Sequence, residues 1–220
     1  MGKNGKDLLC VGCMLIVAFV VWTWLIQIVD VQSVGVKGTN IGFAAFNTWF
    51  HELTGVHMTI YVITDWFGLI PIFVCMMFGG IGLVQLVTRR SLLRVDCDII
   101  LLGVYYVIVI FSYLIFEMIP INYRPILIEG FMEASYPSST TLLVLSVMPT
   151  LIFQVKRRLQ NPVVSKAICG LVRVFSVFMV LGRLFSGVHW FTDIVGSVML
   201  STGLFCIYKA VVLLCCKEMK

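Results

Sequence analysis

The residues of this chain that could do chemistry gather in its last third, most clearly over residues 182–193. His189 and Asp193 are four residues apart, so on a helix they share a face. An aspartate that accepts a hydrogen bond from one imidazole nitrogen fixes the tautomer and leaves the other nitrogen free to attack. Arg183 lies six residues before His189, and a guanidinium can bind phosphate through two parallel hydrogen bonds. The segment predicts nucleophilic attack on a phosphoryl group. The alternative is a helix cap with Arg183 as a membrane anchor.

Two earlier segments favour the phosphoryl interpretation over the helix cap. Residues 117–125 include Arg124, and residues 136–141 place Ser138 and Ser139 at the start of an expected helix. Backbone N–H groups and hydroxyls at a helix N-terminus form an anion site. Two arginines, a helix start and an oriented histidine on one face of the protein suit a phosphate.

The elements that carry these segments are expected to be transmembrane helices. The chain has 220 residues, of which 60% are hydrophobic and 12% charged, whereas soluble domains average about 25% charged. Because a spanning helix needs about 20 apolar residues, we expect an all-α bundle of six spans in one domain, residues 1–220. The expected spans are residues 8–29, 66–87, 99–119, 138–155, 166–185 and 191–214. The fourth contains Pro149 and is expected to be kinked and packed inside the bundle.

The placement of lysine and arginine predicts the orientation of the bundle. Basic residues concentrate before the first span, between the second and third, between the fourth and fifth, and after the sixth. These groups are Lys3 and Lys6; Arg89, Arg90 and Arg94; Lys156, Arg157, Arg158 and Lys166; Lys217 and Lys220. They share one side, so both termini are expected in the cytoplasm and the three chemical segments outside. Scattered anchors of this kind do not predict nucleic-acid binding.

Two further features of the sequence predict structure but not chemistry. Residues 44–53, within the expected outer loop of residues 30–65, are predicted to form an interfacial helix. The eight cysteines lie in or beside apolar runs or near cytoplasmic charges, so they are expected to form no disulfide.

The three segments resemble the signature motifs of the type 2 phosphatidic acid phosphatase family, which shares its fold with vanadium haloperoxidases. The resemblance covers about residues 117–193. It implies that Arg124, Arg183, Ser138 and the Ser139 backbone bind phosphate. It also implies that His189 becomes a phosphohistidine oriented by Asp193, without a metal or other cofactor. The implied partner is a membrane lipid, and the implied location is a bacterial plasma membrane with the active site outside the cytoplasm.

The chain departs from the family motifs at four positions. Glu117 stands where the family has a phosphate-binding lysine, and Thr140 stands where it has the histidine that protonates the leaving oxygen. Gly182 and Ser139 replace a serine and a glycine. Because general acid catalysis contributes about 10²–10⁴-fold, the loss of the histidine favours a leaving group that needs no proton, such as the phosphate of a polyprenyl pyrophosphate. Alternatively, His51 or His57 supplies the acid.

The leading prediction is therefore an enzyme, a lipid phosphate or diphosphate phosphatase. Two alternatives stay open. One is a lipid-phosphate binder or transporter that resembles the type 2 phosphatidic acid phosphatases (PAP2) but has impaired catalysis. Glu117 and Thr140 favour this alternative. The other is a lipid phosphotransferase, because a phosphohistidine can pass its group to an acceptor other than water.

Overall fold

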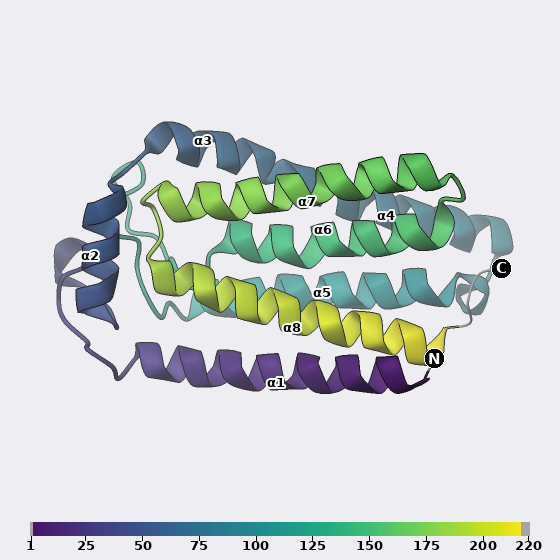
Figure 1. Cartoon of the computed structure of the whole chain (residues 1–220), viewed down its shortest axis with the longest axis horizontal. Helices are drawn as coiled ribbons and strands as arrows, with labels where there is room; N and C mark the ends of the chain where they lie inside the picture. The colour runs from purple at the N-terminus through teal and green to yellow at the C-terminus, as the bar shows by residue number, and fades with distance from the viewer. Residues whose placement is uncertain (1, 217–220) are drawn as a thin grey trace.

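The protein, described here by a computed structural model, is a bundle of long helices with one short helix across its end (Figure 1). The structure describes residues 2–216, and side chains over residues 5–216. Its helices are α1 Gly2–Ile26, α2 Ala44–Thr54, α3 Met58–Phe67, α4 Leu69–Arg89, α5 Cys97–Met118, α6 Ser139–Arg158, α7 Pro162–Phe185 and α8 Phe191–Cys215. Two short 3₁₀ helices cover Val36–Gly38 and Leu92–Arg94.

Six helical segments of the described chain are long and apolar enough to cross a membrane, which confirms the predicted all-α architecture. Five lie close to their expected positions. The second does not, because it runs over Met58–Arg89, with α3 and α4 joined at Gly68. The prediction began this span too late because it treated Asp65 as the end of an outer loop. In the structure Asp65 is part of α3 and pairs with Arg183, so its charge does not end the helix.

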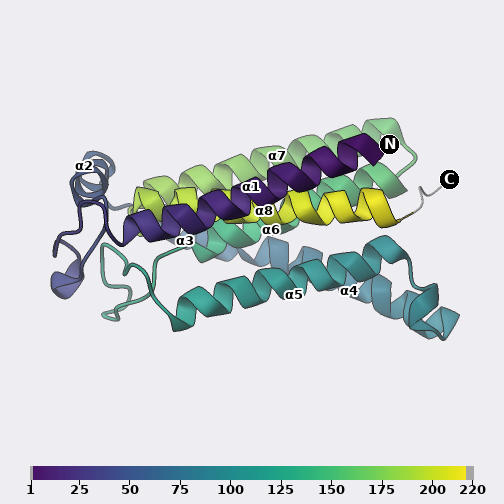
Figure 2. The same cartoon turned by 90° about the horizontal axis from the view of Figure 1, so that it is seen from below.

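Helix α6 occupies the middle of the bundle, as predicted. It packs against α4, α5, α7 and α8, and it is the most buried of the spans. Figure 2 shows α4 and α5 along one side and α1, α7 and α8 along the other. Buried hydroxyls link α6 to α5, since the Tyr106 and Thr150 hydroxyls lie 2.7 Å apart and the Tyr105 hydroxyl donates to the Ser146 carbonyl at 2.9 Å. Interhelical hydrogen bonds of this kind help to hold transmembrane helices together, because the hydrophobic effect does not drive helix association within lipid. The helix continues through Pro149.

One end of the bundle is closed by α2 and by three loops. The predicted helix over residues 44–53 is confirmed as α2, which crosses this end beside the starts of α3 and α8 (Figure 1). The Asn47 side chain ties α2 in place by donating to the Gly42 carbonyl at 2.8 Å and to the Thr192 hydroxyl at 3.0 Å. The three loops are residues 27–43, 119–138 and 186–190, and the last two carry Arg124, Ser138 and His189 of the predicted chemical residues.

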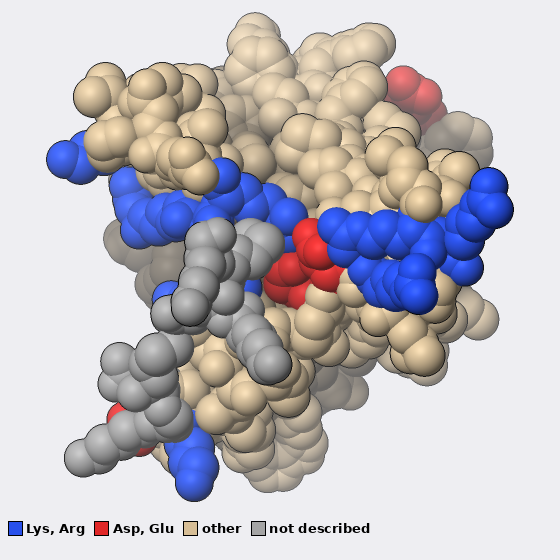
Figure 3. Space-filling view, turned by 90° about the vertical axis from the view of Figure 1, so that its right-hand side faces the viewer, with Lys and Arg blue, Asp and Glu red and all other residues tan. Residues whose placement is uncertain are grey.

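The opposite end is highly charged, with basic side chains around a small acidic group (Figure 3). It also holds a disulfide between Cys97 and Cys216, whose Cα atoms are 5.8 Å apart. The expectation that no cysteine forms a disulfide is therefore wrong, because the start of α5 and the end of α8 meet here although they are 119 residues apart in sequence. Lys217 and Lys220, and the side chain of Lys3, were predicted to be cytoplasmic and lie outside the described residues.

Candidate active site

His189 lies in the tight loop that joins α7 to α8. Its neighbour Gly187 has a φ of 71° and sits against the backbone of Gly55 and Val56, where a Cβ would not fit. The imidazole is buried, and its Nδ1 lies 3.1 Å from the Ser135 carbonyl oxygen. A carbonyl only accepts, so Nδ1 carries the hydrogen and Nε2 carries the lone pair. Nε2 is buried and has no hydrogen-bond partner among the described residues.

Asp193 lies beside His189 but is bonded mainly to its own loop. Its Oδ2 accepts from the Trp190 backbone N–H at 2.9 Å, and its Oδ1 accepts from Asn122 Nδ2 at 3.2 Å. Oδ2 is 3.9 Å from His189 Nδ1, farther than the Ser135 carbonyl. The predicted pair is therefore brought together, with Asp193 fixing the loop and the Ser135 carbonyl taking the Nδ1 hydrogen.

The electrostatic surroundings keep His189 neutral. Burial lowers the pKa of His189 well below its ordinary value, and the positive charges of Arg124 and Arg183 lower it further. The hydrogen bond to the Ser135 carbonyl opposes this shift without cancelling it. A neutral imidazole with a free, buried Nε2 is the form that attacks as a nucleophile.

Arg183, near the end of α7, is held by side chains from two other helices. Its side chain is only 1% exposed, and its Nη2 lies 3.0 Å from Asp65 Oδ1 in α3. The same nitrogen donates to the Thr140 hydroxyl at the start of α6. The guanidinium carbon lies 4.9 Å from the centre of the Tyr61 ring, and Nε has no hydrogen-bond partner among the described atoms. The group is thus positioned but not saturated.

Arg124 lies in the loop after α5 and approaches the site from the other side. Its Nε is 3.1 Å from Glu133 Oε2, and its backbone N–H donates to the Glu133 carbonyl at 3.1 Å. The side chain is 9% exposed, and its Nη1 has no hydrogen-bond partner within the described chain. Its guanidinium carbon lies 5.7 Å from the Tyr61 ring centre, so one ring contacts both predicted phosphate-binding arginines.

The start of α6 contributes its two serines differently. The Ser138 side chain is fully buried, donates to the Thr141 hydroxyl at 3.1 Å and lines neither of the two cavities described below. Ser139 is partly exposed and lines two adjoining cavities. The N–H groups of the first helical turn have no partner within the helix, so they are available to an anion at this point.

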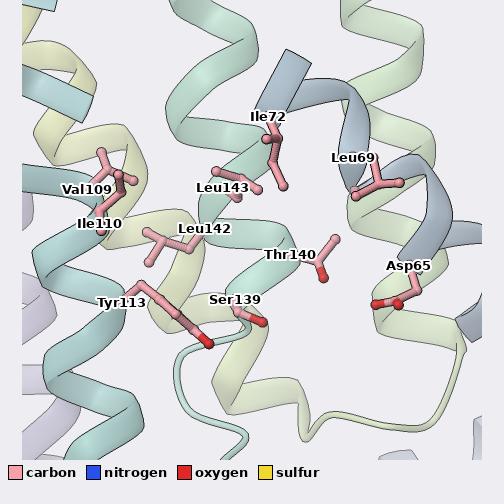
Figure 4. Close-up of a pocket in the computed structure, with 11 residues that line it drawn as sticks. Asp65, Leu69, Ile72, Val109, Ile110, Tyr113, Ser139, Thr140, Leu142 and Leu143 are labelled. Carbon is pink, nitrogen blue, oxygen red and sulfur yellow. The ribbon is translucent and has the colours of Figure 1, made fainter. Parts of the chain in front are cut away.

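Two cavities adjoin the start of α6 and share Tyr113, Ser139 and Leu142 in their walls. The larger, of about 300 Å³, lies between α4, α5 and α6. Figure 4 shows its oxygen-bearing side chains along the lower edge and its aliphatic side chains above them. The second, of about 260 Å³, contains Arg124 together with Glu117 and Glu133. A charged group and an alkyl chain could therefore be accommodated next to one another.

The sequence model described as the PAP2 superfamily matches residues 105–214, half of the chain. This chain belongs to the PAP2 superfamily. Among solved structures it is similar to the one titled "Crystal structure of the first transmembrane PAP2 type phosphatidylglycerolphosphate phosphatase from Bacillus subtilis". That alignment covers 95% of this chain and 98% of the other, with a TM-score of 0.66 and 16% identity, so it shows a shared fold. No curated protein sequence matches this chain. The chain is thus an integral membrane protein with the fold of a PAP2 phosphatase.

The departures from the PAP2 motifs have definite places in the structure. Thr140, which replaces the motif histidine, lines the larger cavity and bonds to Arg183. Glu117 is exposed at the end of α5 and lines the second cavity, near Arg124 but without an ion pair in the described chain. His51 bonds to the Gly187 carbonyl at 3.1 Å and His57 to the Thr54 carbonyl at 2.9 Å. Neither of these histidines lines the two cavities, and His189 and Arg183 also lie behind the residues that line them.

Sequence reasoning missed four residues that shape this PAP2 site: Asp65, Asn122, Glu133 and Tyr61. Asp65 and Glu133 are the counter-ions of the two arginines, and Asn122 holds Asp193. The signal for Asn122 was present, since a polar residue two positions before Arg124 lies within the first motif segment. Asp65 also stood out as a charge within an apolar run. Nothing in the sequence links Asp65 to Arg183 across 118 residues.

Proposed function

We propose that this chain is a membrane lipid phosphate or diphosphate phosphatase that works through a phosphohistidine on His189. The observation that carries the proposal is the buried imidazole, whose Nδ1 is bonded to a carbonyl while Nε2 has no partner among the described atoms. A histidine in a merely structural role would use both nitrogens, because a buried polar atom without a partner costs free energy.

The proposed reaction has two steps. In the first, the Nε2 lone pair of His189 attacks phosphorus, and the bond to the leaving oxygen breaks with its electron pair on that oxygen. Arg124, Arg183 and the N-terminus of α6 hold the phosphoryl oxygens while charge develops on them. In the second step, water attacks phosphorus, the nitrogen–phosphorus bond breaks, and inorganic phosphate leaves with Nε2 restored. Fixed cations take the place of a metal in this scheme.

The larger cavity supports a lipid as the substrate. Its lining changes from Ser139, Thr140 and Asp65 at one edge to aliphatic side chains of α4, α5 and α6 at the other (Figure 4). A phosphate at the polar edge would place an attached chain against Leu69, Ile72 and Leu143, within the membrane-spanning helices. We further propose that this site faces the outer side of a bacterial plasma membrane and that residues 1–220 form a single domain.

The leaving group is the second part of the proposal. With Thr140 at the position of the PAP2 acid, no histidine lines the cavities to protonate a departing alkoxide. The phosphate of a diphosphate leaves as a stabilised anion, which favours a lipid diphosphate such as a polyprenyl pyrophosphate. Equally poor rates on diphosphates and monoesters would remove this preference.

The test is phosphate release by the purified protein in detergent micelles from phosphatidic acid, phosphatidylglycerol phosphate and undecaprenyl pyrophosphate. We expect release that His189→Ala abolishes and that is fastest with the diphosphate. The matched control is His57→Ala, a solvent-exposed histidine outside both cavities, which should leave release unchanged. If no lipid is hydrolysed, and wild type and His189→Ala bind the lipids equally, the chain is a lipid-phosphate binder and the enzyme proposal fails.

A further inference from the structure

The cavity around Arg124 contains more negative charge than a phosphate site needs. Arg124 lines it together with Glu117 and Glu133. Glu133 is the ion-pair partner of Arg124, whereas Glu117 has no basic partner within the described part of the chain. On the other side of Ser139, Arg183 is likewise paired with Asp65. Each arginine proposed to bind phosphate therefore already has a carboxylate beside it.

The open position on Arg124 nevertheless points to an anion. Only 9% of its side chain is exposed, and its Nη1 has no hydrogen-bond partner among the described atoms. Arg124 thus combines a place in the lining of a polar cavity with a buried nitrogen that lacks a partner, and such a nitrogen can donate to a phosphate oxygen. A bound phosphate would then share Arg124 with Glu133 and Arg183 with Asp65.

Binding of a phosphate leaves the carboxylates without enough positive charge. The two arginines would then have to balance the phosphate as well as the carboxylates of Glu133 and Asp65. Glu117, in the same cavity as Arg124, adds a further negative charge. Like charges at such short range repel, and the repulsion is only partly screened in a half-buried site. A ligand that brings its own positive charge close to its phosphate would relieve this repulsion.

The same cavity offers the groups that bind a protonated amine. Besides Glu117 and Glu133, its walls include the aromatic rings of Tyr113, Phe116 and Tyr136. Carboxylates attract an ammonium group directly, and aromatic faces attract it through their negative potential. Carboxylate and aromatic groups thus occur together within one cavity of about 260 Å³, next to the proposed phosphate position.

We propose that, among lipids with the same phosphate group, this site prefers those that carry a protonated amine close to the phosphate, with Glu117 and Glu133 as the residues that select the amine. The proposal rests on the proposed function for the phosphate position. It concerns the charge near the phosphate and is independent of whether a monoester or a diphosphate reacts faster.

The experiment compares two lipids that differ in one charge. One is a long-chain sphingoid-base phosphate, whose amine is on the carbon next to the phosphate-bearing carbon, and the other is its N-acetyl derivative. Binding of each to His189→Ala protein in detergent is measured by calorimetry, so that recognition is separated from turnover. Phosphate release by the wild-type protein is measured in parallel.

We expect the amine to tighten binding by about tenfold, and the double variant Glu117→Gln, Glu133→Gln to reduce this preference to about twofold or less. Glu129→Gln is the matched control, since Glu129 lies in the same loop and lines neither cavity. It should keep the full preference.

The outcomes separate this inference from the proposed function. A preference for the amine without any phosphate release would retain the inference and overturn the phosphatase. Release from both lipids with equal binding would retain the phosphatase and overturn the inference. A preference that Glu129→Gln weakens as much as the double variant would also overturn it.

Discussion

At the end of the bundle opposite the candidate site, Arg158 uses all of its guanidinium nitrogens. Its Nε donates to Gln154 at 2.9 Å, its Nη1 to Asp96 at 3.1 Å and its Nη2 to Asp98 at 2.7 Å. Arg89 completes the network through Asp96 at 2.7 Å. In the candidate site, Arg124 and Arg183 each have one carboxylate and at least one nitrogen without a hydrogen-bond partner among the described atoms.

This difference predicts that Arg158 stabilises the fold and that Arg124 and Arg183 bind a ligand. Arg157, at the charged end, also has a buried Nε without a hydrogen-bond partner among the described atoms, so the prediction rests on an unpaired nitrogen beside a polar cavity and not on an unpaired nitrogen alone. A guanidinium whose three nitrogens are all bonded stabilises the fold, because a new ligand must first displace one of these bonds. An unsatisfied one carries a cost that a ligand can relieve. Asp96 is one of the carboxylates bonded to Arg158. Burial alone would raise its pKa, but the hydrogen bonds from Arg89 and Arg158 outweigh burial and hold the pKa below the ordinary value.

The largest effect is expected at His189, whose Nε2 has no hydrogen-bond partner among the described atoms. His189→Ala should lower kcat by more than about a thousandfold, because it removes the nucleophile itself. Phosphate release measures the loss, and an unchanged Tm in detergent would show that the fold is intact. Release within about tenfold of wild type would contradict the role of His189.

The next largest effect should come from an unsaturated arginine. Arg124→Gln should lower kcat/KM by about 10²–10³-fold, as expected for loss of one fixed charge at a developing anion. Its Tm should change little, because the Nη1 of Arg124 makes no hydrogen bond within the described chain that the substitution would remove. A large fall in Tm with normal kcat/KM would assign Arg124 to the structural class.

The saturated arginine should respond in the opposite way. Arg158→Gln leaves the buried Asp98 carboxylate, 3% exposed, with only Arg157 at 3.6 Å. We expect a loss of about 3 kcal/mol in the free energy of unfolding, measured by denaturant titration in detergent. We also expect kcat/KM within about twofold of wild type. A loss of activity without a loss of stability would mean that the two ends of the bundle are coupled.

A smaller effect is expected at the hydroxyl that positions Arg183. Thr140→Val keeps the shape of the side chain and removes the acceptor for Nη2. Because a hydrogen bond to a charged group contributes about 1.5–3 kcal/mol, we expect kcat/KM to fall by about ten- to a hundredfold. Thr140→Ser, which restores the hydroxyl, should recover most of the activity. Failure of serine to do so would show that the hydroxyl is not what matters.

The pH profile gives the finest distinction. A histidine with a lowered pKa stays neutral until the pH falls below that pKa, so the acidic limb of kcat/KM should lie below the ordinary value of 6.5. The charge of Arg124 contributes to the lowering, so in Arg124→Gln the pKa should rise and the residual activity should be lost at higher pH. An acidic limb that does not move would show that Arg124 is electrostatically remote from His189.

The sequence predicted those parts of the protein that depend on local pattern. Apolar runs of spanning length identified all six spans, because the requirement for about 20 apolar residues is local. Arg183, His189 and Asp193 could be proposed from the sequence because their spacing is itself local. The start of the second span was misplaced because Asp65 is neutralised by a residue far along the chain.

The bonding state of each arginine could not be predicted from the sequence. The acidic partners of Arg158 lie 60 and 62 residues away in sequence, so no local pattern links them, whereas the partner of Arg124 is Glu133 in the same loop. The same holds for His189, whose Nδ1 bonds to a backbone carbonyl 54 residues away and not to the nearer Asp193. Ser138 was expected to face the phosphate, and its hydroxyl is instead bonded to Thr141.

The central claim is that His189 forms a covalent bond to phosphorus, and the most direct test is to trap that bond. The wild-type protein is mixed with a lipid phosphate or diphosphate, quenched rapidly in alkali and analysed by mass spectrometry of its peptides. Our account predicts a phosphoryl group on His189 that is stable in alkali, is lost in acid and is missing from His189→Ala. Phosphate release by the wild-type protein without any phosphohistidine at this position would contradict it.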